Sequence, residues 1–295
     1  CDLKSEQGLA LVKQLITKAD VMIENFAPGV IERLGLGYDE VKAINPGIIY
    51  AQVKGFAEGG PYEKFLSFDM IGQAAGGIMS ITGEPDGRPL KPGTTLGDTG
   101  TGMLMAISIL GALYQKKETG VGQRLTVAMQ DAMLQYARLA FSDTMKTGKP
   151  SARAGEGVVT GGNAPMGLFP CKPGGSNDYV YIYVNRANNR QWHRLLEVIG
   201  QPELIGDPRF ETARDRYANK DEINAMLIPW TQARTKAEAM EIIGGAGVPC
   251  SAVYDTVELQ DNPDFETRGI FQWVDHPTRG KVKMPAWPVQ MSGND

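Results

Sequence analysis

The sequence has few of the residues that build disulfide frameworks and metal centres. Its 295 residues include three cysteines, Cys1, Cys171 and Cys250, and two histidines, His193 and His276. An odd number of widely separated cysteines forms neither a disulfide framework nor a zinc knuckle, and free thiols are typical of the reducing cytoplasm. We therefore expect a cytoplasmic protein with no metal site, in which both histidines are ordinary surface or structural residues.

A strong charge of one sign and a long apolar run are also missing. The formal net charge is −4 and there is no block rich in Lys and Arg, so neither nucleic acid nor a membrane surface is expected as a partner. The longest apolar run, Met103 to Tyr114, is shorter than the ~20 residues that cross a bilayer, and we expect it to be a buried helix. The hydrophobic content of 42% is that of an ordinary globular protein.

The first part of the chain alternates helical and strand patterns. Ser5 can cap a helix with an apolar face, and "VMIEN" (residues 21–25) resembles a short buried strand. A helical segment over Asp39–Asn45 then precedes a second apolar strand, "GIIYAQV" (residues 47–53). This order, with short connections, predicts a parallel α/β sheet. Two longer helices are expected further along, over Gly102–Lys117 and Val127–Met145.

A change of composition separates this part from the rest of the chain. Residues 146–165, "KTGKPSARAGEGVVTGGNAP", are rich in Gly, Pro, Ser and Ala, and are expected to be a linker with a functional loop. Beyond them, "DYVYIYV" alternates as a sheet strand does, and Thr235 with Glu238 forms a capping box for the next helix. This second half is expected to be a separate α+β unit.

Asp98 lies in the glycine-rich run "GDTGTGM" (residues 97–103), directly before the apolar stretch. An aspartate at this place is a favoured helix N-cap, which is the plainer interpretation. The glycines would also let the backbone approach a ligand closely, and a helix N-terminus favours an ionised carboxylate, as a nucleophile requires. The run lacks both the P-loop and the dinucleotide-binding spacing. Since no Ser-His-Asp or Cys-His arrangement is present, a carboxylate is the only plausible covalent catalyst.

Three other features have two interpretations each. Gly161 and Gly162 are either part of a flexible linker or a mobile loop that closes over a site and donates N–H groups to an oxyanion. Arg33 and Lys4 are either solvated charges or residues that pair with phosphate. The residue pattern alone leaves these alternatives open.

Taken together, these segments resemble the class III CoA-transferases, the family of formyl-CoA transferase and carnitine CoA-transferase. The resemblance covers essentially the whole chain, and the "ENF-PG" and "GD-TGM" segments, in this order and separation, are specific to it. It rests on "ENFAPGVIERLG" (24–35), "AINPGIIYAQVKGFAEGGPY" (43–62), "QAAGGIMSITG" (73–83), "GDTGTGM" (97–103), "ETGVGQRLTVAMQDAML" (118–134) and "AGVPCSAVY" (246–254).

The resemblance implies a fold and an assembly. We expect a Rossmann-like parallel-sheet domain over residues 1–145, a linker and glycine loop over 146–165, a smaller α+β domain over 166–265, and a segment 266–295 that returns toward the large domain. Two such chains are expected to interlock as a homodimer. The resemblance also implies that the family's first ~70 residues and a C-terminal piece are missing from this chain, and parallel sheets tolerate a lost central strand poorly because both their faces are buried. We therefore expect either a longer natural protein or impaired activity.

The resemblance also implies a site. Asp98 matches the family's catalytic aspartate, which passes CoA from an acyl-CoA to a small carboxylic acid through an aspartyl anhydride and an aspartyl-CoA thioester. Gly161 and Gly162 match a glycine loop that covers these intermediates, and Asp69 matches an acidic position close to the catalytic aspartate. CoA is a co-substrate here, and no other cofactor is expected. The positions that match CoA contacts are Lys4, Asn25, Phe26 and Arg33, the two cations lying near its phosphates.

Within the family, "VKGFAEGGPY" and "VAMQDAML" are most similar to the formyl-CoA:oxalate branch, and the doubled glycine suits a flat diacid such as oxalate. Phe68 stands where these enzymes tend to carry Tyr, and Leu66 where a Lys contacts CoA. The lost hydroxyl can remove a hydrogen bond worth roughly 1–3 kcal/mol, so the pair of acids is left open. One alternative is an α-methylacyl-CoA racemase, which uses a His at the position of Phe68. The other is a non-catalytic CoA-binding subunit.

Overall fold

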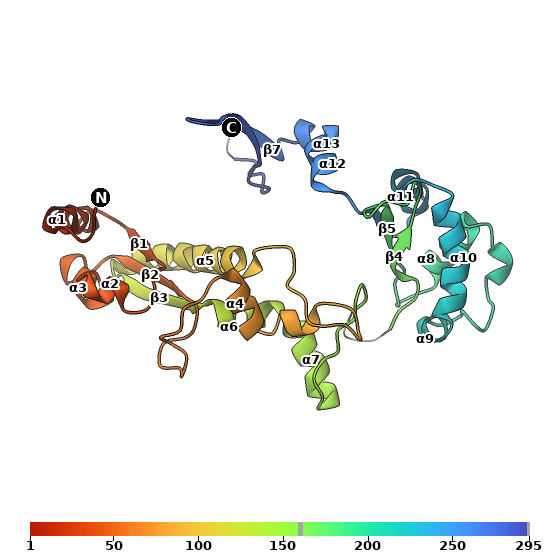
Figure 1. The fold of residues 1–295 in the computed structure, drawn as a ribbon, viewed down its shortest axis with the longest axis horizontal. Coiled ribbons are helices and arrows are strands. Elements are labelled where there is room, and N and C mark those ends of the chain that lie inside the picture. The colour runs from red at the N-terminus through yellow and green to blue at the C-terminus, as the bar shows by residue number, and fades with distance from the viewer. Residues whose placement is uncertain (159–161, 294–295) are drawn as a thin grey trace. The chain divides into compact units, whose positions relative to one another are not determined.

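The computed structural model describes residues 1–158 and 162–293. The chain divides into two compact units, Cys1–Gly161 and Gly162–Asp295, which are described separately (Figure 1). The boundary between them falls inside the segment 146–165, where the composition changes.

The first unit is built on three parallel strands in the order β1-β2-β3. β1 (Val21–Glu24) pairs with β2 (Ile49–Lys54), which pairs on its other side with β3 (Gln123–Ala128). The register places Glu24 beside Gln52, so the three strands end near one another at their carboxyl edge. The expected parallel α/β sheet is confirmed.

Helices cover both faces of this sheet. Tyr50 of β2 packs on one face with residues of α1 (Glu6–Ile16), α2 (Val30–Arg33) and α3 (Tyr38–Ile44). Its strand neighbours Ile49 and Ala51 pack on the other face against α5 (Leu96–Thr119). Successive side chains of a strand point to opposite faces, so β2 is buried on both sides, as a parallel sheet requires. Ser5 caps α1, as expected, by accepting the backbone N–H of Gly8.

The expected helix over Val127–Met145 is wrong at its start. The residues Gln123–Ala128 form β3, and two shorter helices follow, α6 (Met129–Tyr136) and α7 (Arg138–Thr147). The physical reason is the alternation of Leu125 and Val127 with polar residues, which turns both apolar side chains toward α5. The remaining segments of this unit are α4 (Asp69–Ala75) and the 3₁₀ turn η1 (Met79–Ile81).

The long helix α5 is buried on one side only. Met105, Ile109 and Ala112 pack on the sheet, whereas Ile107 and Leu110 are exposed. Among the described residues, α5 is the one helix long and apolar enough to cross a membrane, and 28% of its apolar window is buried. The expectation of a buried helix therefore holds for one face and is wrong for the other.

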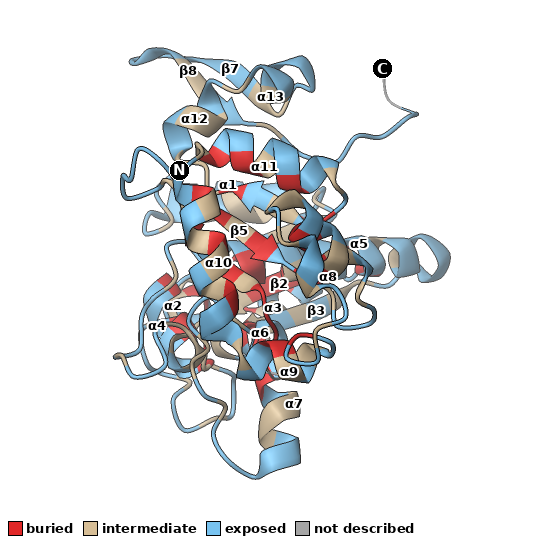
Figure 2. Ribbon diagram, turned by 90° about the vertical axis from the view of Figure 1, so that its right-hand side faces the viewer, coloured by how far each residue is buried: buried red, intermediate tan, exposed pale blue. Residues whose placement is uncertain are grey.

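The second unit contains an antiparallel sheet covered by helices. Its strands β4 (Met166–Pro170), β5 (Tyr179–Tyr183) and β6 (Cys250–Ala252) are in the order β4-β5-β6. Val180 and Ile182 of β5 lie in a core with side chains of three helices. These helices are α8 (Arg190–Val198), α10 (Lys220–Gln232) and α11 (Lys236–Gly245), the last with the expected capping box of Thr235 and Glu238. In Figure 2 the ribbon at β5 has the colour of buried residues.

The unit is completed by short elements. The 3₁₀ turn η2 (Pro202–Leu204) and α9 (Ala213–Ala218) connect α8 to α10. After β6 follow α12 (Thr256–Gln260), α13 (Pro263–Thr267) and the antiparallel hairpin of β7 (Phe271–His276) and β8 (Gly280–Pro285). The return of residues 266–295 to the large domain and the interlocked homodimer stay predictions.

Candidate active site

Asp98 lies in the first turn of α5 and is exposed. The helix begins at Leu96, so Asp98 is its third residue, and the N-cap position belongs to Thr95, whose side chain makes no capping bond. The prediction that Asp98 is the N-cap is therefore wrong. Within the described parts of the chain, the Asp98 carboxylate accepts no hydrogen bond. The geometry leaves a carboxylate free to attack.

Asp69 supplies the cap that Thr95 does not. Its buried Oδ1 accepts the backbone N–H of Gly97 at 2.8 Å and lies 3.4 Å from the backbone nitrogen of Asp98. Gln73, fully buried one turn along α4, donates its side-chain amide to both oxygens of Asp69 at 3.0 and 2.9 Å. The carboxylate of one helix thus fixes the first turn of the next. The structure brings together Asp69 and Asp98, as the resemblance implied.

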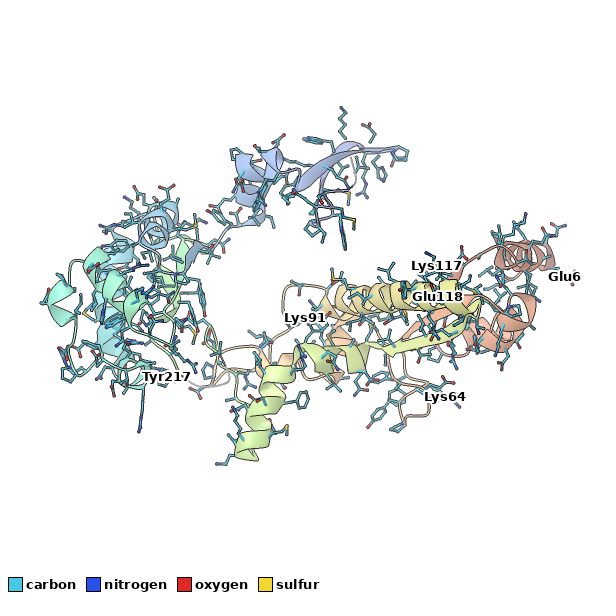
Figure 3. The ribbon with its side chains drawn as sticks, turned by 180° about the vertical axis from the view of Figure 1, so that it is seen from behind. Glu6, Lys64, Lys91, Lys117, Glu118 and Tyr217 are labelled. Atoms are coloured by element: carbon cyan, nitrogen blue, oxygen red, sulfur yellow. The ribbon has the colours of Figure 1, made fainter. Side chains whose placement is uncertain are left out.

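A lysine at the same end of α5 completes this arrangement. Lys91 Nζ lies 3.8 Å from Asp69 Oδ2. Figure 3 shows Lys91 at the N-terminal end of α5 and Lys117 near the opposite end. The cation offsets part of the charge that two neighbouring carboxylates place at this helix start.

Two glycines of the "GDTGTGM" run are required by close contacts. A Cβ at Gly97 would lie 2.5 Å from the backbone oxygen of Asp69, and a Cβ at Gly100 would lie 2.9 Å from the ring of Tyr136. The hydroxyl of Tyr136 also donates to the Gly100 carbonyl at 3.1 Å. Their lack of a side chain lets α4 and α6 reach the turn that holds Asp98. By contrast, a Cβ at Gly102 would meet nothing within 4 Å.

Phe68 and Leu66 precede α4, and each is 70% exposed. Phe68 directly precedes Asp69 in the chain, and its side chain offers no group that accepts or donates a proton. A racemase base is therefore missing at this position.

The turn after β1 presents the predicted CoA contacts Asn25 and Phe26, and both side chains are exposed. Phe26 lines an apolar groove together with Leu3, the neighbour of Lys4. Arg33, at the end of α2, lines a different cavity. The turn 25–29 therefore leads from one hollow to the other. Leu3 lines the first hollow and Arg33 the second, and Lys4 is among the lining residues of neither.

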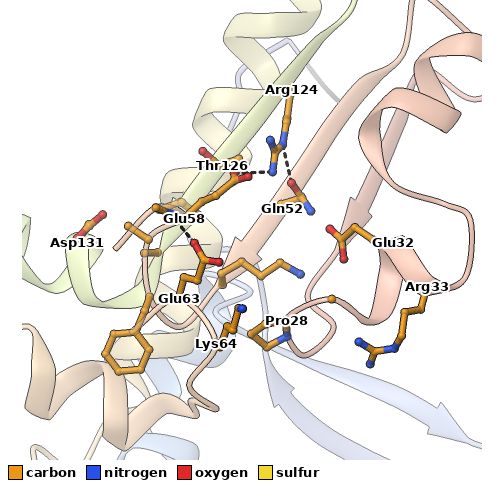
Figure 4. A pocket seen from close by; sticks show the side chains of 17 residues that line it. Pro28, Glu32, Arg33, Gln52, Glu58, Glu63, Lys64, Arg124, Thr126 and Asp131 are labelled. Atoms are coloured by element: carbon orange, nitrogen blue, oxygen red, sulfur yellow. Dashed lines mark hydrogen bonds and ion pairs between the residues drawn. The ribbon is translucent and has the colours of Figure 1, made fainter. Parts of the chain in front are cut away.

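The cavity beside Arg33 has a volume of about 1070 Å³ and lies at the carboxyl ends of the sheet strands (Figure 4). This is the edge at which open parallel sheets bind ligands, and small-molecule sites occupy roughly 300–1,000 Å³. Charged side chains of both signs line it. They are Glu32, Arg33, Lys54, Glu58, Glu63, Lys64, Arg124 and Asp131.

A hydrogen-bonded row of side chains runs across the three strands next to this cavity. The sequence did not predict it. Glu24 accepts from Gln52 Nε2 at 2.7 Å, and Gln52 Oε1 accepts from Arg124 Nε at 2.7 Å. Lys54 also reaches Glu24, with 2.7 Å between Nζ and Oε1. These residues come from β1, β2 and β3 in turn. The available signal was a polar or charged residue in each strand, with Glu24 and Gln52 among apolar neighbours and Arg124 in the alternating pattern of β3.

Of the predicted glycine loop, Gly161 lies outside the described residues. Gly162 belongs to the second unit, where a Cβ on it would lie 2.3 Å from ring atoms of Tyr217. The ring therefore packs directly on the Gly162 backbone, which explains why this position is a glycine.

The comparisons with known proteins agree on one family. The model of CoA-transferase family III matches residues 1–295. A formyl-CoA:oxalate CoA-transferase of Streptomyces coelicolor is 39% identical over 98% of this chain and 72% of its own length. One of Bradyrhizobium sp. (strain ORS 278), with the same name, is 36% identical over 99% of this chain and 72% of its own length.

A solved structure is similar over the whole chain. The crystal structure of a CAIB/BAIF family protein from Brucella suis is 32% identical, with a TM-score of 0.84. The match covers 100% of this chain and 75% of that one.

Proposed function

The chain belongs to CoA-transferase family III, and we propose that it moves CoA from a small acyl-CoA such as formyl-CoA to a carboxylate such as oxalate, through Asp98. Both relatives described above are named for this reaction. The single observation that carries the proposal is the placement of Asp98, exposed and without a hydrogen-bond partner among the described residues, in a first helical turn fixed by Asp69.

The reaction proceeds by two exchanges at the Asp98 carbonyl. The carboxylate attacks the acyl carbonyl of the acyl-CoA, its oxygen bonds to that carbon, and the carbon–sulfur bond breaks to release CoA thiolate. The thiolate then attacks the aspartyl carbonyl of the anhydride, which releases the first acid as its carboxylate and leaves an aspartyl-CoA thioester. A carboxylate suits this role because both its anhydride and its thioester remain reactive.

The second acid reverses these steps. Its carboxylate attacks the aspartyl-CoA carbonyl and releases the thiolate again, giving a new anhydride. The thiolate attacks the acyl carbonyl of this anhydride, so the new acyl-CoA forms and Asp98 returns as a free carboxylate. Every step exchanges an oxygen and a sulfur nucleophile, and no other cofactor is required.

The binding roles are part of the same proposal. Asn25 and Phe26 contact CoA, Lys4 and Arg33 lie near its phosphates, and Gly161 with Gly162 covers the intermediates. Exposure of Asn25 and Phe26 and the cationic character of Lys4 and Arg33 support these roles. Phe68, which cannot take a proton, speaks against racemisation.

The test incubates the chain with formyl-CoA and oxalate and follows oxalyl-CoA. The unaltered chain should form it, and Asp98→Asn should lose turnover while it still binds CoA. Full activity of Asp98→Asn would reject the mechanism. CoA binding by the unaltered chain without turnover would favour a non-catalytic subunit, and loss of an α-deuteron from a 2-methylacyl-CoA would favour a racemase.

A further inference from the structure

We propose that Glu24 and Lys54 are positioning residues that hold the Asn25–Phe26 turn in the conformation that binds CoA. This inference rests on the proposed function, because it takes the side chains of Asn25 and Phe26 as contacts of CoA. It adds two residues that neither touch the reacting atoms nor are among the positions matched to CoA contacts.

The geometry fixes both backbone groups of a single residue. Glu24 Oε2 accepts the Phe26 N–H at 2.9 Å, and Lys54 Nζ donates to the Phe26 carbonyl at 2.9 Å. β1 ends at Glu24, so the ladder of the sheet no longer supplies partners for these groups. Two side chains from neighbouring strands take over that function.

The two clamping groups are themselves held. The Glu24 side chain is 1% exposed and Lys54 20%, and their nearest charged atoms are 2.7 Å apart. Gln52 donates to Glu24 as well, so three donors surround this buried carboxylate. Burying an ion pair stabilises a fold little compared with apolar packing. A buried pair whose two members both bond to the backbone of one residue is better explained by the conformation it imposes.

In that conformation the backbone of the turn is held by the protein, while its side chains are exposed. The backbone of Phe26 is tied inward, while its ring is 40% exposed and the side chain of Asn25 is also exposed. A turn held in this way is already ordered before a ligand arrives. Binding then costs less conformational entropy than it would on a free turn.

The test compares CoA affinity by calorimetric titration among four forms of the chain. Lys54→Met leaves a buried carboxylate without its cation and is at risk of unfolding, so the main variant is the double substitution Glu24→Gln with Lys54→Met. Lys54→Arg keeps the charge and a donor. Lys117→Met is the matched control, because Lys117 is an exposed lysine of the same unit that lines neither hollow. Thermal unfolding shows that each form is folded.

The expected result is a rise of the CoA dissociation constant by about tenfold in the double variant. A change of this size corresponds to the loss of one to two charge-assisted hydrogen bonds. The KM for acyl-CoA should rise with it while kcat changes less. Lys54→Arg should keep most of the affinity, and Lys117→Met all of it. An unchanged affinity in the folded double variant would overturn the proposal.

If Glu24 and Lys54 only stabilised the fold, their loss would weaken CoA binding whether or not the side chains of Asn25 and Phe26 were present. A variant that lacks these two side chains tests this. In a chain carrying Asn25→Ala and Phe26→Ala, the Glu24→Gln and Lys54→Met pair should cause no further loss of CoA affinity. An equal loss in both backgrounds would contradict positioning through the turn. Hydrogen exchange of the Phe26 amide is independent of CoA and should be faster in the double variant. If the Phe26 amide exchanges faster in the double variant but the unaltered chain binds no CoA, then Glu24 and Lys54 do hold the turn and the proposed function is wrong.

Discussion

The carboxylate of Asp69 accepts the backbone N–H of Gly97 at 2.8 Å, and this bond caps the start of α5. Without it, the first turn would have no side-chain cap, because Thr95 makes no capping bond. The bond caps a helix in which Asp98 stands within the first turn rather than in front of it. Two acidic residues share one helix N-terminus, one as its cap and the other exposed to solvent.

Replacement of Asp69 by alanine should destabilise the chain and impair turnover. Loss of a helix cap costs about 0.5–2 kcal/mol of unfolding free energy, and kcat should fall because Asp98 occupies the same turn. Denaturant unfolding and steady-state kinetics measure the two effects. Thr95→Ala is the matched control and should change stability by less than about 0.5 kcal/mol. Equal effects of the two substitutions would show that Asp69 is not the cap.

Two glycines of the same helix should respond in opposite ways to alanine. Gly97→Ala should destabilise, since its Cβ would lie 2.5 Å from the Asp69 backbone oxygen, which cannot rotate away. Gly102→Ala should leave the fold intact and stabilise it by up to about 1 kcal/mol, because its Cβ meets open space and alanine favours a helix. Thermal unfolding of both variants checks this. A stable, fully active Gly97→Ala chain would contradict the described contact with α4.

The three cysteines should differ in reactivity. Burial raises the pKa of the Cys250 thiol from 9.0 to about 12 and also raises the pKa of Cys171, whereas Cys1 is exposed. The thiolate is the reactive form, so iodoacetamide at pH 8 should modify Cys1 in the folded chain and all three only after unfolding. Peptide mass spectrometry gives the sites. Labelling of Cys250 in the folded chain at the same rate as Cys1 would contradict this prediction.

The same thiol adds a pH dependence to stability. Because the pKa of Cys250 is higher in the folded state than in the unfolded state, the protonated thiol contributes stability below about pH 9. This contribution should decline as the pH rises toward about 12. The free energy of unfolding of Cys250→Ala should therefore decline less between about pH 9 and about pH 12 than that of the unaltered chain.

The parts of the fold that could be predicted are those with a local signal. β1 and β2 are apolar runs between helical segments, and the capping box of Thr235 and Glu238 lies within four residues. β3 was missed because its alternating residues lead directly into a helical pattern at Met129. Only pairing with the distant β2 decides between the two structures.

The candidate site likewise combines features that have a local sequence signal with features that depend on long-range contacts. The glycine pattern around Asp98 indicated a special turn, but the residue that caps it is Asp69, which lies 28 positions from Gly97 in sequence. Glu24 and Lys54 are likewise 30 residues apart, and their common hold on Phe26 appears only when β1 and β2 pair. Long-range contacts of this kind have no periodicity from which they could be predicted.

The central claim is that Asp98 carries the acyl group and then CoA as a covalent intermediate. The chain is quenched with hydroxylamine while it turns over formyl-CoA and oxalate, and the peptide containing Asp98 is measured by mass spectrometry. We predict a hydroxamate on Asp98 whenever formyl-CoA is present, and none when formyl-CoA is replaced by buffer. Turnover without any modification of Asp98, or a hydroxamate on another carboxylate such as Asp69, would contradict the account.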